Sequence, residues 1–438
     1  MICKVEYLQN LTSPLGKDLM QKFNFTDSQA CQHLAEQYET PLYLYSQNAI
    51  EQQCKTMLSV PAPYGLTVRY ALKANPNVAI LKIIENTGMH FDASSEHEVK
   101  RCLNAGIPAF KIQLTSQEMS RHHLDLIISE GVHFNACSLI QLERYAKVAA
   151  AGTEISIRMN PGLGSGSTRK TNVGGPSSSF GIWFEQLDEA VALINKYDLK
   201  LTRLHSHIGS GADPKVWKKA ASLTLDIARK LPDVKTVNLG GGFKVARHSG
   251  EKSTCMIEVG KTLVKVLEDE AAATGREYHL ELEPGTFIMA NSGSLLTRVD
   301  DITKTGDEGY TFLKIDAGMD MLTRPALYAA HHPCLPLSER TETEEYVITG
   351  HCCESGDLFT VSADDTLEPR TLPKTEVGEL MIIEGAGAYC SSMSVINYNS
   401  FPQASEVLIA NDKKSHLIRQ RQTLEQITQN ESLPSFLK

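Results

Sequence analysis

The sequence lacks several features that would place the protein in a specialised class. Its 43 Lys and Arg are outnumbered by 52 Asp and Glu, so the net charge of −9 offers no basic excess for nucleic acid or an anionic membrane. The 10 cysteines are scattered and form no CxxC pair of the kind that binds zinc or makes a redox site. No apolar run approaches the roughly 18 residues of a membrane span, and no leader-like segment opens the chain. These absences predict a reduced, cytoplasmic protein whose partners include neither nucleic acid nor membrane.

Short apolar segments alternate with helical patterns over much of the 438-residue chain. Eight of them have the length and composition of buried strands: 68–73, 90–92, 111–114, 133–136, 154–160, 203–209, 236–241 and 278–285. Several of the helical segments between them begin at Ser or Asn and end near Gly, which are capping residues. The alternation predicts an α/β fold, a parallel (β/α)8 TIM barrel. A doubly wound sheet is the alternative, because periodicity does not show whether the sheet closes.

The pattern changes after about residue 300. Strand-like segments at 312–316, 345–352, 358–363 and 380–385 follow one another without regular helices, which predicts a β-rich domain of barrel or sandwich type. We expect residues 46–300 to form the barrel domain, and residues 1–45 and 301–438 to form the β-rich domain, with the N-terminal segment packed on it. The stretch 162–179 is rich in Gly and Ser, and we expect a mobile loop there, of the kind that closes over an active site.

Residues with chemical potential fall at the carboxyl ends of the expected strands, where (β/α)8 barrels carry their active sites. The first strand ends in Lys73, the sixth carries His205 and His207, the seventh runs into Gly240–Gly242, and the eighth ends in Glu283. Each has an ordinary structural explanation when it is taken alone: an extended lysine, packed histidines, a tight turn and an ion pair. Their shared location is what indicates a site.

Together these residues fit pyridoxal phosphate. Lys73 offers an amine for an imine with the cofactor, and the glycine triplet lets backbone N–H groups approach a phosphate. We expect His207 to lie flat against the planar ring. Glu283 would hold a proton on the ring nitrogen, so that the ring accepts an electron pair. We expect no metal, because the pair of His205 and His207 has no clear set of further ligands.

Ten motifs, in order along the chain, resemble those of pyridoxal-phosphate decarboxylases built on an alanine-racemase-like barrel. This is the ornithine, diaminopimelate and arginine decarboxylase group, and the resemblance covers about residues 40–425. CESGD and RPALY are typical of its diaminopimelate branch rather than of ornithine decarboxylases or racemases. The motifs are YALKANPN (70–77), FDASSEHEV (91–99), RMNPG (158–162), HSHIGSG (205–211), GGGF (240–243), EPG (283–285), DAGM (316–319), RPALY (324–328), CESGD (353–357) and GAYCSSMSVINYNSFP (387–402).

The resemblance implies a role for each matching residue. Lys73, His207 and Glu283 match the lysine that binds the cofactor, the histidine stacked on its ring and the acid at its nitrogen. Cys353 matches the acid that protonates the substrate carbon. In this family it comes from the partner subunit, so the implied active unit is a homodimer with shared sites. The residues expected to hold the cofactor also include Ser210, Gly240, Gly241, Gly242, Pro284, Gly285, Thr286 and Tyr389. Those expected to bind the amino-acid substrate are Arg324, Tyr328, Glu354 and Tyr389.

The reaction implied by the resemblance is decarboxylation of meso-2,6-diaminopimelate to L-lysine and carbon dioxide, a step of lysine biosynthesis. One departure bears on the substrate: the family commonly has EPGR, and Thr286 stands here in place of the arginine. Threonine keeps a hydroxyl donor but loses the positive charge, so recognition of a substrate carboxylate is either weaker or rebuilt. The alternatives are a decarboxylase of another basic or amino-dicarboxylic acid, an amino-acid racemase, and a non-catalytic regulator on the same fold.

Overall fold

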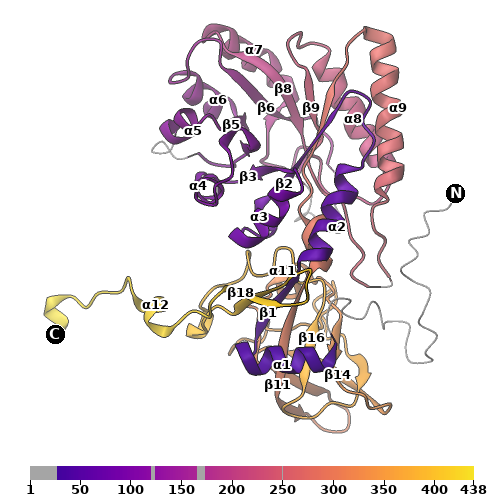
Figure 1. Cartoon of the computed structure of the whole chain (residues 1–438), viewed down its shortest axis with the longest axis vertical. Helices are drawn as coiled ribbons and strands as arrows, with labels where there is room; N and C mark the ends of the chain where they lie inside the picture. The colour runs from indigo at the N-terminus through magenta and orange to yellow at the C-terminus, as the bar shows by residue number, and fades with distance from the viewer. Residues whose placement is uncertain (1–26, 120–123, 165–172, 249) are drawn as a thin grey trace. The chain divides into compact units, whose positions relative to one another are not determined.

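A computed structural model describes residues 27–119, 124–164, 173–248 and 250–438 of the chain (Figure 1). The centre of the loop expected at 162–179, and most of the N-terminal segment expected to pack on the β-rich domain, lie outside these residues. The described chain forms two compact units. One comprises residues 50–245 and 252–288, and the other comprises residues 27–49, 246–251 and 289–438. Within the described ranges, no helix is long and apolar enough to cross a membrane.

Eight parallel strands of the first unit close into a barrel. Each pairs with its neighbours in the order β2-β3-β4-β5-β6-β8-β9-β10, β10 pairs with β2, and the contact between β5 and β6 completes the ring. The (β/α)8 prediction is thereby confirmed, and the doubly wound alternative is wrong because the sheet has no open edge. The strands are β2 (Leu66–Ala71), β3 (His90–Ala93), β4 (Ile112–Leu114), β5 (His133–Ala136), β6 (Glu154–Asn160), β8 (Lys200–Ser206), β9 (Thr236–Asn238) and β10 (His279–Leu282), and the short β7 (Ile182–Trp183) pairs with β6.

Helices surround these strands in Figure 1. Side chains cap several of them: Ser95 and Ser138 each accept a hydrogen bond from the backbone N–H three residues later, and Asp213 accepts from Lys215 N. These N-caps begin the helices soon after the preceding strands end, so the loops between a strand and its helix stay short. The helices are α2 (Gln47–Leu58), α3 (Val78–Asn86), α4 (Glu96–Asn104), α5 (Leu124–Glu130), α6 (Leu139–Ala146), α7 (Leu187–Lys196), α8 (Pro214–Ala228) and α9 (Met256–Thr274).

A buried ion pair lies inside the barrel. Arg69 on β2 donates from Nη2 to Oε1 of Glu281 on β10 over 2.9 Å, and Nη1 of Arg203 lies 3.2 Å from the same oxygen. Although burial opposes it, the positive charge of Arg69 and Arg203 lowers the pKa of Glu281 to about 2. Glu281 therefore stays ionised and balances two cations that the barrel would otherwise bury without a partner.

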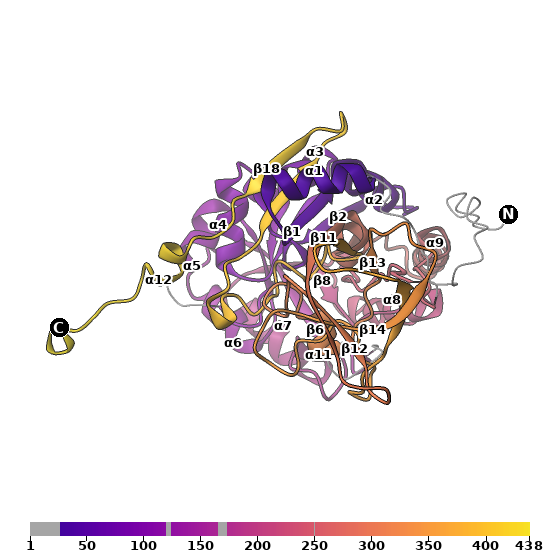
Figure 2. The ribbon, with the colours of Figure 1, turned by 90° about the horizontal axis from the view of Figure 1, so that it is seen from below.

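The second unit is built on a mixed β-sheet with the order β15-β14-β12-β11-β1-β17-β18. Its core is apolar and includes Leu42, Leu44, Leu296 and Val407. Figure 2 shows helix α1 (Ser28–Tyr38) beside β18, where the hydroxyls of Tyr38 and Ser415 lie 3.2 Å apart. The strands are β1 (Leu42–Ser46), β11 (Gly293–Lys304), β12 (Thr311–Ile315), β13 (Cys334–Pro336), β14 (Thr343–Thr349), β15 (Arg370–Pro373), β16 (Leu380–Ile383), β17 (Ser405–Ile409) and β18 (Ser415–Arg419).

Two expectations about this unit need correction. The long strand β11 pairs with β1 and β16 rather than with a barrel strand, so the change of unit falls at Ile288–Met289 and not at residue 300. The segment 358–363 forms no regular strand. Leu358 makes an isolated bridge to Thr349 at the end of β14, and Val361 makes one to Leu367, which lies outside the named strands.

Candidate active site

The barrel strands end earlier than the sequence suggested, and the expected site residues lie just beyond them. Strand β2 stops at Ala71, so Lys73 lies in the single 3-10 turn η1 (Leu72–Ala74), not on the strand. Its neighbours Leu72 and Ala74 are buried while the lysine is exposed. A turn lets the two apolar neighbours face the core and directs the lysine outward. The carboxyl end of a barrel strand is where such a group meets a ligand.

Glu283 follows β10 and is buried, with amide donors on one side. Nε2 of Gln113 and Nδ2 of Asn238 donate to its Oε1 over 2.9 and 2.6 Å. The other oxygen, Oε2, lies 3.4 Å from Nε2 of His205. Burial raises the pKa of Glu283, and the bond from Asn238 and the charge of Lys73 oppose that rise. Two neutral amides therefore fix the orientation of the carboxylate. A bound ligand could still supply the positive charge that pairs with it.

The two histidines differ in their surroundings. His205 lies within β8 and is buried, and the amide of Asn135 lies 2.6 Å from its Nδ1. His207 lies one residue beyond the strand. Burial, and next Arg158, lower the pKa of both rings well below the usual value. Both imidazoles are therefore neutral near pH 7, and Asn135 already engages Nδ1 of His205.

The glycine triplet stands against the histidine. A Cβ at Gly240 would come within 2.6 Å of Nδ1 of His207, and a Cβ at Gly242 would come within 2.0 Å of the carbonyl oxygen of Gly209. Gly240 and Gly242 also have φ values of +70° and +96°, a region that L side chains rarely adopt. Asn238 holds the turn by accepting a hydrogen bond from Gly240 N over 2.8 Å. Only glycine fits at these two positions, so the backbone itself, with no side chain, lies beside the His207 ring.

Four further residues expected to hold the cofactor follow strands β8 and β10: Ser210, Pro284, Gly285 and Thr286. Ser210 is partly buried and follows β8 by four residues. The carbonyl of Pro284 accepts from Ala71 N over 3.1 Å, which ties the eighth strand end to the first. Thr286 begins the single-turn helix α10 (Thr286–Met289) immediately after Gly285. The motif EPG thus connects the buried acid to a short helix.

Asp92 is a site residue that the sequence analysis gave no role, although its motif was recognised. It lies on β3, and Nε2 of Gln113 contacts its Oδ1 over 3.4 Å as well as Glu283. Burial and the charge of Glu283 raise the pKa of Asp92 to about 7, against the opposing effect of Lys73. Two buried carboxyl groups therefore lie near one another, and the charge of Lys73 acts on both. Only the tertiary structure shows it, because their strands lie far apart along the chain.

The raised pKa of Asp92 predicts how stability depends on pH. Its folded-state pKa lies above the unfolded value, so its contribution is present at acid pH and is lost as the pH rises through about 7. In the cofactor-free protein, we expect Asp92→Asn to increase Tm at pH 8 by about 3 °C or more and to have a smaller effect at pH 5. The exposed Asp188→Asn is the matched control. Parallel melting curves for Asp92→Asn and the wild type at both pH values would contradict the assignment.

The residues expected to bind the substrate lie in the second unit. Arg324 begins helix α11 (Arg324–Tyr328), and its guanidinium lies 5.9 Å from the centre of the Tyr328 ring. Nε of Arg324 donates to Nε2 of His332 over 3.2 Å, and Nδ1 of His332 donates to Glu384 O over 2.9 Å. His332 thus orients Arg324, and nothing in the sequence pattern had pointed to this histidine. Tyr389 has a φ of +57°, an uncommon backbone conformation that is often found at functional sites.

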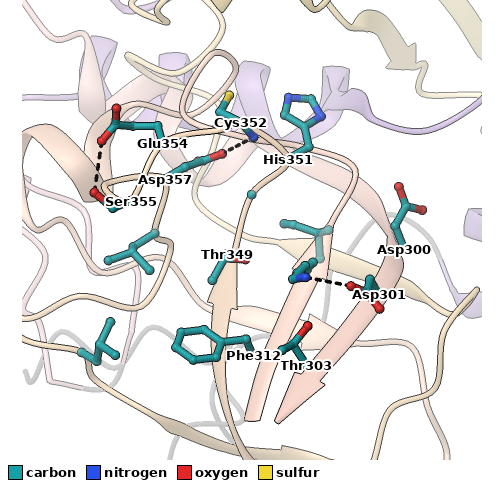
Figure 3. Close-up of a pocket in the computed structure, with 15 residues that line it drawn as sticks. Asp300, Asp301, Thr303, Phe312, Thr349, His351, Cys352, Glu354, Ser355 and Asp357 are labelled. Carbon is teal, nitrogen blue, oxygen red and sulfur yellow. Dashed lines mark hydrogen bonds and ion pairs between the residues drawn. The ribbon is translucent and has the colours of Figure 1, made fainter. Parts of the chain in front are cut away.

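The CESGD segment lies beside a hollow of about 700 Å³ in the same unit (Figure 3). Cys353 and Glu354 are exposed, whereas Cys352 is buried with its backbone N–H bound to Asp357. Asn399 accepts a hydrogen bond from Cys353 N over 2.8 Å, and the Tyr398 hydroxyl donates to Glu354 over 3.4 Å. Burial and Asp357 raise the pKa of the Cys352 thiol. Of the two neighbouring cysteines, Cys353 is therefore the one available to a ligand.

Comparisons with known proteins bear on this arrangement. Residues 47–290 match the family model for the pyridoxal-dependent decarboxylase, pyridoxal binding domain. The diaminopimelate decarboxylase of Streptomyces coelicolor is 34% identical over 410 residues, which cover 91% of each chain. A crystal structure of diaminopimelate decarboxylase superposes with a TM-score of 0.87 at 31% identity, over 94% of this chain and 98% of that one. The enzyme of Helicobacter pylori, solved in complex with L-lysine, has a TM-score of 0.81 at 28% identity and is matched over 98% of its length by 91% of this chain.

Proposed function

The chain belongs to the pyridoxal-dependent decarboxylase family, and from this membership we propose that it converts meso-2,6-diaminopimelate to L-lysine and carbon dioxide. The relatives of that name match it over nine-tenths of the chain, and at 34% identity the match extends through both structural units. The observation that carries the proposal is the constellation of Lys73, His207 and Glu283 at the carboxyl ends of barrel strands. Each has the residue type that the cofactor chemistry needs.

The residues present fit pyridoxal phosphate. Nδ1 of His207 is buried and has no hydrogen-bond partner among the described residues, and its ring lies against Gly240. The glycine turn presents backbone where any side chain would collide. Glu283 directs a buried carboxylate whose ionised form gains from a cation. A flat, anionic cofactor with a protonated ring nitrogen matches a neutral ring, bare backbone and a buried acid.

When bound, the cofactor serves as an electron sink for the bond from the reacting carbon to the leaving carboxylate. The chain supplies what that chemistry requires. Lys73 offers the amine that holds the cofactor and takes it back after each turnover. Glu283, fixed by Gln113 and Asn238, keeps a proton on the ring nitrogen. His207 covers one ring face, and its neutral form brings no competing charge. Ser210, Gly240–Gly242, Gly285 and Thr286 are proposed to hold the phosphate, together with Tyr389.

We propose that Cys353 delivers the proton to the carbon that has lost its carboxylate. We expect Cys353→Ala to keep the cofactor bound and to lower kcat by about 10²-fold, the usual contribution of a positioned acid. Cys255→Ala, which removes a partly exposed thiol from the start of α9, is the control and leaves kcat unchanged. An unchanged kcat in Cys353→Ala would show that another group supplies the proton.

The same proposal places Cys353 and Glu354 in the active site of a partner subunit, which makes the active unit a homodimer. Their exposure supports this, since both side chains are available for contact with a second chain. We expect a mixture of the Lys73→Ala and Cys353→Ala variants to regain activity after exchange of subunits, because one mixed site then contains both intact residues. Size-exclusion chromatography under the same conditions measures the mass of the active species. No regain of activity from a dimer that exchanges subunits would place both residues in one chain.

A substrate panel tests the proposed function directly. Steady-state release of carbon dioxide, with product identification, is measured for meso-diaminopimelate, lysine, ornithine and arginine. We expect diaminopimelate to give the highest kcat/KM and L-lysine as its product. A preference for another amino acid would assign the chain to a related decarboxylase, and racemised substrate without carbon dioxide would indicate a racemase. A protein that binds no cofactor would be a non-catalytic regulator, an alternative that the retained Lys73 and Cys353 disfavour.

A further inference from the structure

Three side chains of different metal-binding types meet beside the CESGD segment: Asp320, His351 and Cys352. One atom of each, a carboxylate oxygen, an imidazole nitrogen and the thiol sulfur, lies within 4.8 Å of the other two. Asp320 and Cys352 are buried, and His351 is partly buried. All three belong to the second unit, whereas the expectation of no metal rested on His205 and His207 in the barrel. The cluster is therefore a separate candidate for a ligand site.

Two neighbouring parallel strands bring the cluster together. Strand β12 pairs in parallel with β14, so the carboxyl ends of both strands lie at one edge of the sheet. Asp320 follows the end of β12, and His351 and Cys352 follow the end of β14. The carboxylate of Asp357 joins the two loops, since its Oδ1 accepts from Met319 N over 2.7 Å and its Oδ2 accepts from Cys352 N over 2.8 Å. The backbone on both sides of the cluster is thereby held in place.

The distances within the cluster are close to those between the ligands of one metal ion. Oδ1 of Asp320 lies 2.8 Å from Nε2 of His351 and 3.5 Å from Sγ of Cys352. Zinc binds oxygen and nitrogen at about 2.0 Å and sulfur at about 2.3 Å, so a tetrahedral centre separates such ligands by about 3.3 to 3.5 Å. The carboxylate and the imidazole therefore need to part by only about half an ångström to admit the ion.

The surroundings of His351 direct its imidazole toward the carboxylate. The ring of Phe401 stacks on it, with the ring centres 3.6 Å apart and the planes 6° from parallel. His351 N also donates to Ala317 O over 3.2 Å. A Cβ at Gly318 would come within 2.8 Å of both Oδ1 of Asp320 and Cδ2 of His351. The glycine therefore lets the carboxylate and the imidazole meet, and the stacked ring holds the imidazole in its orientation.

Buried acidic groups at this edge of the sheet lack a basic partner. Asp320 and Asp357 are only 4% and 3% exposed. Among the described residues, no lysine or arginine forms an ion pair with either carboxylate, and Asp320 has only the imidazole of His351. A buried carboxylate is stabilised by a cation beside it. The hollow of about 700 Å³ in Figure 3 is lined by His351 and Cys352, so an ion can enter from that side.

We propose that Asp320, His351 and Cys352 bind a zinc ion, with a water molecule from the hollow as the fourth ligand. Carboxylate, imidazole and thiolate are all zinc ligands, and a thiolate disfavours Mg²⁺ and Ca²⁺. The thiol proton passes to solvent as the bond between sulfur and zinc forms. The ion joins the loop after β12 to the loop after β14, and so fixes the backbone that presents Cys353. The inference is independent of the proposed decarboxylation.

Zinc binding by the intact holoenzyme tests the proposal. The protein is treated with a chelator, dialysed against zinc chloride and analysed for metal content. We expect the wild type to bind about one zinc ion per chain. Cys352→Ser and Asp320→Asn should weaken zinc binding by more than about 100-fold, because loss of a group that only supports a metal ligand already costs about 10- to 100-fold. Cys353→Ala and Cys255→Ala each remove another thiol and are the controls, with the zinc affinity of the wild type.

Two further measurements identify the ligands and the effect on the fold. X-ray absorption at the zinc edge should show one sulfur at about 2.3 Å and lighter ligands at about 2.0 to 2.2 Å, in the wild type and in Cys353→Ala. Saturating zinc should raise the Tm of the wild type by about 3 °C or more and leave that of Cys352→Ser unchanged. In the presence of chelator, the two proteins should melt alike. Excess Mg²⁺ should not displace the zinc.

Several outcomes would overturn the zinc site. A wild type that binds no zinc, or equal zinc affinity in the wild type and in all four variants, would show that the cluster is held by its hydrogen bonds alone. Zinc lost in Cys353→Ala but retained in Cys352→Ser would place the ion at the exposed thiol. Displacement by Mg²⁺ would exclude a thiolate ligand. If Cys352→Ser melts early in chelator, Asp320→Asn makes the comparison, since asparagine keeps the shape and the oxygen acceptor beside His351 while it removes the charge.

Discussion

Lys73→Ala is expected to abolish decarboxylation, with kcat at least about 10³-fold below the wild type. The residue provides the amine that anchors the cofactor and releases the product. Its 3-10 turn places the side chain outward while Leu72 and Ala74 anchor the backbone. Alanine fits this turn without strain, so the variant should fold. The measurements are carbon dioxide release and the visible absorbance of bound cofactor. We expect the spectrum of the variant to lack the band of the lysine-linked form.

Lys82→Ala is the matched control for this loss. Lys82 is a surface lysine on the neighbouring helix α3 and pairs with Glu85. Its removal should leave both kcat and the cofactor spectrum unchanged, because surface ion pairs contribute about 0–1 kcal/mol. Full activity in Lys73→Ala with a normal melting temperature would remove the cofactor assignment altogether. Loss of activity in both variants would point to a folding defect in this part of the barrel.

Glu283→Gln is expected to lower kcat by about 10²- to 10³-fold while the protein remains stable. Glutamine keeps the shape of the side chain but cannot hold a proton on the ring nitrogen by charge. Burial raises the pKa of Glu283, so the folded protein gains little from its ionised form before the cofactor binds. The stability of the cofactor-free variant should therefore equal or exceed that of the wild type, and the loss should appear in turnover.

Glu281→Gln, two residues earlier in the chain and on β10, should show the opposite pattern. Glu281 is ionised between Arg69 and Arg203, and its removal leaves two cations in the barrel without their acid. Breaking a buried pair of this kind costs about 3–5 kcal/mol of stability. Denaturant unfolding and steady-state kinetics measured on both variants separate a catalytic acid from a structural one. Equal effects of the two substitutions on kcat and on stability would contradict this division between Glu283 and Glu281.

Much of the fold could be predicted from the sequence, because local sequence patterns indicate the strands and helices of the barrel. Each buried strand is a short apolar segment, and the capping serines and glycines mark the helices between them. The strand ends were placed less well. The expected first strand included Lys73, whereas the chain turns after Ala71. An apolar residue in a turn and one in a strand look alike in sequence, and only the pairing of β2 with β3 and β10 distinguishes them.

The candidate site was predictable in its chemistry but not in its supporting groups. Motifs identified Lys73, His207 and Glu283 as residue types suited to the cofactor. Nothing local indicated that Gln113 contacts both Asp92 and Glu283, or that His332 holds Arg324. These contacts join segments that are 8 to 170 residues apart in the chain. Hydrogen bonds of this kind depend on how strands are placed in the sheet, which no short pattern records.

The sequence by itself determined the class of fold, the family and the residue types that carry the chemistry, because strand periodicity and motif spacing are local properties of the chain. The tertiary structure alone decided which charges are balanced. It pairs Glu281 with two arginines and buries Glu283 among amides. The physical reason is that the state of an ionisable group depends on burial and on its neighbours in space. The sequence shows the same glutamate whether the fold pairs it with an arginine or buries it without one.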